Sequence, residues 1–183
     1  MKLNIVLLKE SVHLIKRLYF ACIFTATGRT KYINKHKKMF HFVGTHLFWQ
    51  PRKLPPQTEL ISIGNNVSIS SGVEFVTHDI ISTMLNRRFC SGKFENYNAP
   101  IQIGNNVMIG ANTLIMPNVK ICDDVIIAAG SVITKDISIS GVWGGVPAKR
   151  IKSFEDFIEK RSKIIIQNDV NLIWKDFDKL HTK

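Results

Sequence analysis

Isoleucine recurs at every sixth position over a long stretch of this 183-residue chain. The series consists of Ile103, Ile109, Ile115, Ile121, Ile127, Ile133 and Ile139. The residue after each isoleucine is often small, and a small or β-branched residue follows four positions after each of the first six. Self-similarity at a fixed period is the sequence signature of a repeat fold. The series therefore predicts an architecture that repeats with a period of six.

The same hexads occur earlier, as IGNNVS from Ile63, ISSGVE from Ile69 and FVTHDI from Phe75. A helix would drift out of register with a period of six, and a pleated strand would turn alternate residues inward. If each hexad is a short strand plus a bend, the aliphatic side chains point into a shared interior. Successive coils then stack at the parallel-strand spacing of about 4.8 Å. The sequence thus predicts an all-β core of stacked coils.

The repeats divide the chain into an N-terminal helical segment (1–40), a coil domain (41–152) and a C-terminal helix (153–183), with one sizeable core. Charged residues cut the apolar run near the N-terminus into pieces shorter than the roughly 20 residues that span a bilayer. Its aliphatic residues Leu7, Val12, Leu14, Ile15 and Leu18 leave a polar side at helical spacing. We expect this helix to pack on the body, and peripheral contact with a membrane surface is the alternative.

The C-terminal segment begins with Ser153 as a helix N-cap and Asp156 three residues later, close to a capping box. Phe154, Phe157, Ile158 and the run 164–166 follow at helical spacing. We expect this helix to cover the end of the coil stack, which would otherwise expose an unpaired strand edge.

The hexads are interrupted once, because the two copies of IGNNV begin at Ile63 and Ile103, and that separation is not a multiple of six. The interruption, residues 81–102, has no aliphatic hexad and carries Arg87, Arg88 and Tyr97. Long insertions in compact folds are commonly functional, so these three residues are candidates for substrate binding.

The formal net charge of +11 indicates an anionic partner, such as a nucleotide cofactor, an acidic glycan, nucleic acid or a membrane surface. The three cysteines form no CxxC pair. This argues against a disulfide framework and a zinc knuckle and favours a reducing cytoplasm.

The run IGANTLIMPNVKICDDVIIAAGSVITKDI, followed by GGVPAKRI, resembles the hexapeptide-repeat acyltransferases. Within them it is most similar to the acetyltransferases that act on sugars, antibiotics and capsular polysaccharides, over roughly residues 60–152. The resemblance implies a left-handed parallel β-helix, a homotrimer, and acetyl-CoA as co-substrate bound between subunits. It implies a small-molecule or glycan acceptor and no nucleic-acid partner.

Acetyl transfer to a hydroxyl needs a base, and histidine has a suitable pKa near neutrality. His78 in FVTHDI interrupts a hexad just before the excursion and corresponds to the family's catalytic base. Asp79 is a candidate for orienting it. Because Ser131 and Cys122 are expected to point inward or pack, we expect direct transfer without an acyl-enzyme.

Small residues and cations in the matching elements are the candidates for binding acetyl-CoA. The small residues would let pantetheine lie along the backbone, and the cations would meet the phosphates. The candidates are Ala111, Ala129, Thr134, Lys135, Lys149, Arg150 and Lys152.

The sequence leaves three functions open. The first is an acetyl-CoA-dependent O-acetyltransferase for a sugar or surface polysaccharide. The second is an N-acetyltransferase of an amino-sugar nucleotide, which would share cofactor and base. The third is a non-catalytic assembly scaffold, which would not need His78. A zinc carbonic anhydrase of the same fold would want several histidine ligands where the coils offer one, so no metal is expected.

Overall fold

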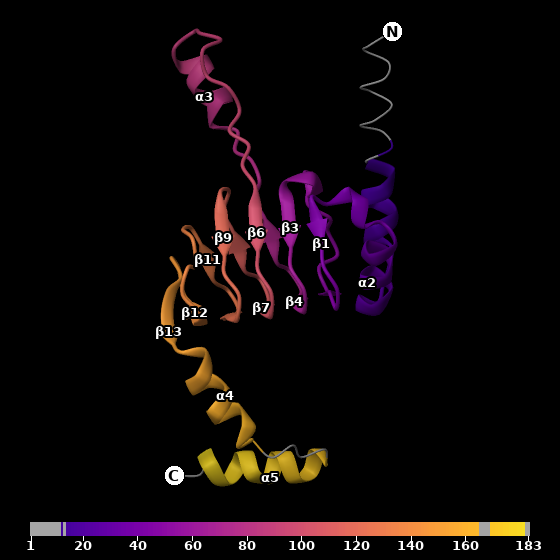
Figure 1. The fold of residues 1–183 in the computed structure, drawn as a ribbon, viewed down its shortest axis with the longest axis vertical. Helices are drawn as coiled ribbons and strands as arrows, with labels where there is room; N and C mark the ends of the chain where they lie inside the picture. The colour runs from indigo at the N-terminus through magenta and orange to yellow at the C-terminus, as the bar shows by residue number, and fades with distance from the viewer. Residues whose placement is uncertain (1–11, 13, 165–168, 182–183) are drawn as a thin grey trace.

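In the middle of the chain, each coil contributes one short strand to each of three parallel sheets. The computed structural model describes residues 12, 14–164 and 169–181. The first sheet holds β1 (Phe42–Val43), β3 (Ile61–Ile63), β6 (Ile101–Ile103) and β9 (Val119–Ile121). The second holds β2 (Phe48–Trp49), β4 (Val67–Ile69), β7 (Val107–Ile109), β10 (Val125–Ile127), β12 (Gly141–Gly144) and β13 (Lys149–Lys152). The third holds β5 (Glu74–Phe75), β8 (Leu114–Ile115) and β11 (Val132–Ile133). All pairs are parallel except β12 with β13, and Figure 1 shows the strands stacked in a row.

The register of the strands confirms the predicted period. Ile103 pairs with Ile121 in the first sheet, and Val107 pairs with Val125 in the second. In both sheets the partners are three hexads apart along the chain, and each hexad supplies a strand to a different sheet. One coil is therefore three hexads long, and every sixth residue returns to the inside.

Six of the seven serial isoleucines, from Ile103 to Ile133, are at most 2% exposed, but Ile139 is 56% exposed. The prediction that Ile139 continues the buried series is wrong. Ile121 bridges Ile137 instead, and Val125 pairs with Gly141, so the last coil is shorter than three hexads. Because this coil closes two positions early, Ile137 takes the inward position.

The repeated IGNNV sequence forms a ladder along one corner of the stack. Asn66, Asn106 and Asp124 each adopt a positive φ near 55°, a conformation that asparagine and aspartate tolerate better than most residues. The Asn66 Nδ2 donates to Asn106 Oδ1 at 2.9 Å, and Asn106 Nδ2 donates to Asp124 Oδ1 at 2.9 Å. These side chains satisfy one another from coil to coil and fix the bend.

The excursion projects from the stack as an arm (Figure 1). It contains a helix, α3 (Ile81–Arg88), and then returns to β6 without further strands. Asn86 holds the arm together, since its side chain donates to the Phe94 carbonyl at 2.9 Å and accepts from the Phe94 N–H at 3.0 Å. Strands before and after the arm pair directly with each other, for example at Ile61 and Ile101, so the coil resumes in register after it.

The N-terminal segment covers the first coil. Residues 14–21 are helical and precede α2 (Ala26–Lys35), η1 (Lys37–Met39) and, after β2, η2 (Thr58–Leu60). The helix over residues 14–21 docks through Phe20, which is fully buried with its ring 5.4 Å from that of Tyr32.

The prediction that Val12, Leu14, Ile15 and Leu18 form the packed face is wrong, because all four are exposed. Leu7 lies outside the described residues. The side chain that docks, Phe20, lies on the opposite side of the helix from Leu18, so the aliphatic side is turned outward.

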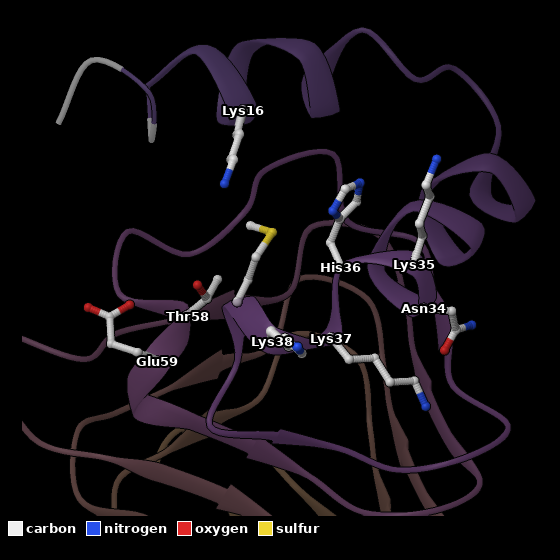
Figure 2. Close-up of a pocket in the computed structure, with 9 residues that line it drawn as sticks. Lys16, Asn34, Lys35, His36, Lys37, Lys38, Thr58 and Glu59 are labelled. Atoms are coloured by element: carbon white, nitrogen blue, oxygen red, sulfur yellow. The ribbon is translucent and has the colours of Figure 1, made fainter. Parts of the chain in front are cut away.

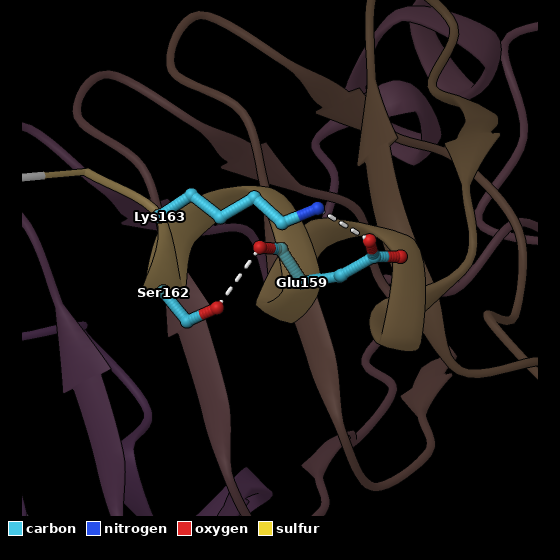
Figure 3. A network of polar contacts seen from close by, with 3 residues as sticks. All are labelled: Glu159, Ser162 and Lys163. Atoms are coloured by element: carbon cyan, nitrogen blue, oxygen red, sulfur yellow. Dashed lines mark hydrogen bonds and ion pairs between the residues drawn. The ribbon is translucent and has the colours of Figure 1, made fainter.

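The C-terminal segment forms α4 (Phe154–Ser162) and α5 (Val170–His181). Ser153 Oγ accepts from the Asp156 N–H at 3.0 Å, which confirms the predicted cap. Glu159 makes two polar contacts at the C-terminal end of α4 (Figure 3). Its carboxylate pairs with Lys163, and its backbone carbonyl accepts a hydrogen bond from the Ser162 hydroxyl.

The expectation that a C-terminal helix covers the end of the stack is wrong. The edge of β12 is paired by the antiparallel strand β13, while α4 and α5 contain no buried residue. Residues 165–168, which include two of the predicted helical isoleucines, lie outside the described residues. Among the described residues no helix is both long enough and apolar enough to cross a bilayer.

Candidate active site

His78 lies where the arm leaves the coil stack. It follows β5 and forms an antiparallel bridge with Asn98 on the returning limb. On either side, the Ala99 N–H donates to the Thr77 carbonyl at 2.8 Å and the Asp79 N–H donates to the Tyr97 carbonyl at 3.1 Å. The two limbs of the arm are thus clamped together at this histidine.

His78 is one of the residues that line a cavity of about 300 Å³. The walls come from the first coils, the N-terminal helix and the proline-rich segment before η2; they are Arg17, Lys53, Leu54, Pro55, Pro56, Val73, Glu74, Phe75 and Val76. The Nδ1 atom is buried and has no hydrogen-bond partner within the described part of the chain. A buried ring nitrogen without a partner costs free energy, which fits a group that is completed by a ligand or by another subunit.

The Asp79 carboxylate is engaged with the backbone of the arm, and His78 Nδ1 has no partner in the described part of the chain. Asp79 Oδ1 accepts from the Ile81 N–H at 3.0 Å, which satisfies the first turn of α3. Asp79 precedes the N-cap residue Ile80 of the arm helix, and its predicted role toward His78 stays a prediction.

Gln57 is a neighbour of the site that sequence reasoning missed. Its Oε1 accepts from Thr77 Oγ1 at 2.7 Å, and its Nε2 donates to Asn98 Oδ1 at 2.9 Å. Gln57 therefore ties both limbs of the arm to the segment before η2. Arg17 and Lys53 of the cavity were missed as well, and none of the three stands in a pattern that could have identified it.

Thr134 and Lys135 follow β11 at the same corner of the stack as His78. The Val76 N–H donates to the Ile115 carbonyl, and the Met116 N–H donates to the Ile133 carbonyl, both at 2.9 Å. Val76, Met116 and Thr134 are therefore equivalent positions on three successive coils. At about 4.8 Å per coil, the Thr134 level lies about 10 Å along the stack from the Val76 level.

Ala111 and Ala129 lie just before β8 and β11. They belong to the edge of the third sheet at which its strands begin, opposite the edge that carries His78, and adjacent coils stack closely there. The Gly130 N–H donates to the Ala111 carbonyl at 2.8 Å, and a Cβ on Gly110 would meet the Ala128 carbonyl carbon at 2.7 Å. Facing outward, Gly130 (φ +70°) has open space where its side chain would be. This edge offers bare backbone to a thin ligand such as pantetheine.

The remaining predicted residues are in two separate places. Lys149, Arg150 and Lys152 belong to β13 at the end of the stack, where Arg150 Nε donates to the Ser140 carbonyl at 3.1 Å. The candidates Arg87, Arg88 and Tyr97 belong to the arm and are exposed. Only Tyr97 lies at the base of the arm beside His78.

Neither predicted inward residue is available as a nucleophile. Ser131 is fully buried, and its Oγ donates to the Ala128 carbonyl at 2.6 Å. Burial raises the pKa of the Cys122 thiol, with Asp123 and Asp124 adding to the rise. A protonated thiol is a poor nucleophile. In the described part of the chain, no three metal-ligating side chains gather at one place.

Comparison with known proteins agrees with the repeat geometry. Residues 100–135 match the family model for the bacterial transferase hexapeptide (six repeats). Protein CapG of Staphylococcus aureus is 46% identical over 101 residues, which are 55% of this chain and 57% of that protein. Galactoside O-acetyltransferase of Escherichia coli (strain K12) is 40% identical over 97 residues, which are 52% of this chain and 45% of that protein. The chain spans about half the length of these curated relatives.

Two solved structures superpose on most of the chain. A maltose O-acetyltransferase from Clostridium difficile 630 gives a TM-score of 0.60 at 25% identity, over 81% of this chain and 88% of the other. A galactoside acetyltransferase in complex with coenzyme A gives a TM-score of 0.59 at 26% identity, over 88% of this chain and 85% of the other.

Proposed function

The chain carries a hexapeptide-repeat transferase domain, and on this premise we propose that it is an acetyl-CoA-dependent O-acetyltransferase for a hydroxyl of a sugar or surface polysaccharide. The observation that carries the proposal is the position of His78. His78 is among the residues that line a cavity at the foot of the arm, and its buried Nδ1 has no partner in the described part of the chain. A scaffold protein would have no need of such a group.

We propose that His78 is the general base. Acetyl-CoA supplies the acetyl group as a thioester. His78 takes the proton of the acceptor hydroxyl as that oxygen forms its bond to the acetyl carbon, and returns the proton to the sulfur as the C–S bond breaks. The burial of Ser131 and the raised pKa of Cys122 support direct transfer over an acyl-enzyme.

The two sets of predicted acetyl-CoA residues suggest that the site is shared between subunits. Thr134 and Lys135 lie on the edge of the third sheet that carries His78, whereas Ala111 and Ala129 lie on its other edge. A neighbouring copy that sets one edge against the other would bring both sets around one ligand. This supports the proposed homotrimer of left-handed β-helices, with Lys149, Arg150 and Lys152 near the phosphates and Arg87, Arg88 and Tyr97 near the acceptor.

The experiment that tests this function is a screen for acetyl-CoA consumption with sugars, nucleotide sugars and oligosaccharides as acceptors. Products are then analysed for O-linked or N-linked acetate. A hydroxyl acceptor that turns over supports the proposal. An acceptor that is acetylated only on nitrogen, or an absence of turnover with every acceptor, overturns it. We place the protein in the cytoplasm, in keeping with its three free cysteines.

A further inference from the structure

One cation of the His78 cavity has no acidic partner. Arg17 belongs to the helix over residues 14–21 and lies three residues before the fully buried Phe20, so both residues face the body of the protein. Arg17 is half-buried, whereas the preceding Lys16 is exposed. Within the described part of the chain Arg17 forms no ion pair. Its guanidinium is therefore free to bind a ligand of the cavity.

The other two charged residues that line the cavity neutralise each other. Lys53 Nζ lies 3.4 Å from Glu74 Oε1. With His78 neutral, as a base requires, Arg17 gives the described lining a single net positive charge. The remaining lining residues are apolar: Leu54, Pro55, Pro56, Val73, Phe75 and Val76. Beside apolar walls a charge attracts its opposite more strongly than in bulk water, so the cavity favours an anionic ligand over a neutral one.

The cavity lies on the side of His78 that faces away from the residues predicted to bind acetyl-CoA. In the third sheet the strand order is β11–β8–β5, and the cavity extends from β5 to the N-terminal helix. Thr134 and Lys135 follow β11, and β13 is at the far end of the second sheet. A thioester held by those residues would leave the cavity to the acceptor.

We propose that the acceptor is an acidic sugar, and that Arg17 binds its carboxylate while His78 takes the proton of a hydroxyl on the same sugar unit. This inference rests on the proposed function and narrows the acceptor to a sugar such as a uronic acid. The planar guanidinium presents paired N–H donors that match a carboxylate. One carboxylate balances the single net charge, and a volume of about 300 Å³ is at the lower end for ligand sites, which suits one sugar unit.

Lys16 provides a matched control on the same helix. It lines a different cavity, of about 580 Å³, between this helix and the residues at the end of α2 (Figure 2). Lys16→Gln and Arg17→Gln each remove one positive charge from adjacent positions, but of the two only Arg17 lines the His78 cavity. A diffuse attraction between the basic segment and an anion would respond equally to both changes.

The test is a titration of the full chain, with CoA present, followed by the NMR signals of the His78 ring. These signals are assigned as the ones absent from His78→Ala. The probes are methyl glucuronide and methyl galacturonide, the matching neutral methyl glycosides, and glucose 6-phosphate. We expect the uronides to bind at least about tenfold more tightly than the neutral glycosides, with a preference that declines as salt screens the charge. Arg17→Gln should remove this preference, and Lys16→Gln should leave it unchanged.

Glu74→Gln is a second variant, which keeps the arginine in place. It releases Lys53 from its ion pair, so the cavity gains positive charge and should bind the uronides about two- to fivefold more tightly. Circular dichroism establishes that each variant is folded. Because NMR detects binding, a failure of acetyl transfer in the acceptor screen would overturn the proposed function while the binding preference is still measured.

Four results overturn the inference. The first is an absence of uronide binding, or equal binding of uronides and neutral glycosides. The second is an equal loss in the Lys16 and Arg17 variants. The third is tighter binding of glucose 6-phosphate than of the uronides, which would make the recognised group a phosphate. The fourth is weaker binding of CoA by Arg17→Gln with uronide binding intact, which would assign Arg17 to the co-substrate.

Discussion

Asn105 and Asp123 are joined across adjacent coils by two hydrogen bonds. The Asn105 backbone N–H donates to Asp123 Oδ1 at 2.7 Å, and Asn105 Nδ2 donates to Asp123 Oδ2 at 3.1 Å. The pair continues a row that starts with Thr45 and Asn65 on the preceding coils. It therefore forms one strip of the corner that keeps the coils in register.

This pair gives the stability of the fold a pH dependence. The backbone hydrogen bond from Asn105, followed by the side-chain hydrogen bond, lowers the pKa of the Asp123 carboxyl. Because the folded pKa lies below the unfolded value of about 3.9, the contribution is complete above that value and is lost as the pH falls through the folded pKa. Asp123→Asn should lower the midpoint of urea unfolding at pH 7, and the difference from the wild type should shrink as the pH falls below the unfolded pKa of about 3.9. Glu95→Gln on the arm is the control. A difference that persists unchanged at low pH would contradict this account.

Close stacking of the coils at Gly110 should make that position intolerant of any side chain. In Gly110→Ala the new Cβ would meet the backbone of Ala128 and Ala129, which cannot move without separating two coils. We expect a loss of about 1–3 kcal/mol in unfolding free energy, measured by urea at fixed protein concentration. Gly92→Ala, where a Cβ meets nothing within 4 Å, should change it by less than about 0.5 kcal/mol. Equal effects at the two positions would show that the stack is not tightly packed here.

Loss of the His78 imidazole should stop catalysis without preventing binding. His78→Ala should lower kcat by roughly two to four orders of magnitude and leave the dissociation constant for acetyl-CoA nearly unchanged. Initial rates measure kcat, and calorimetric titration with acetyl-CoA in the absence of an acceptor measures the dissociation constant. His41→Ala, an exposed histidine outside the cavity, is the control. Near-normal turnover by a folded His78→Ala protein would remove the proposed base.

Lys135 and Lys152 should contribute to the binding of acetyl-CoA through its phosphates. Lys135→Ala and Lys152→Ala should each raise KM for acetyl-CoA severalfold with little change in kcat, on the order of 1 kcal/mol for a partly exposed charge-assisted contact. The effect should be smaller with the dephospho-CoA thioester and should decline as salt screens it. Lys31→Ala and Lys35→Ala should leave KM unchanged. Equal effects of all four changes would mean that the net charge acts as a diffuse field.

The hexad pattern is sufficient to predict the stacked coils. Inward positions in a stack of three-sided coils recur at every sixth position, so Ile127 and Ile133 reveal the period without reference to any distant residue. The bends at the corner are also encoded by local sequence, since asparagine and aspartate tolerate the positive φ that each bend requires. The position of His78 followed from the same period, because it stands where the hexads stop.

Features that depend on contacts between distant segments could not be predicted from the local pattern. The isoleucine at 139 fits the period but is exposed, because the last coil closes two positions early. The aliphatic side of the N-terminal helix faces outward, because Phe20 makes the contact with the body. Arg17 and Gln57 are distant from His78 in the sequence and reach its surroundings only through the winding of the chain. A local pattern records the periodicity of a face, but the partner of that face is set by packing free energy summed over the whole chain.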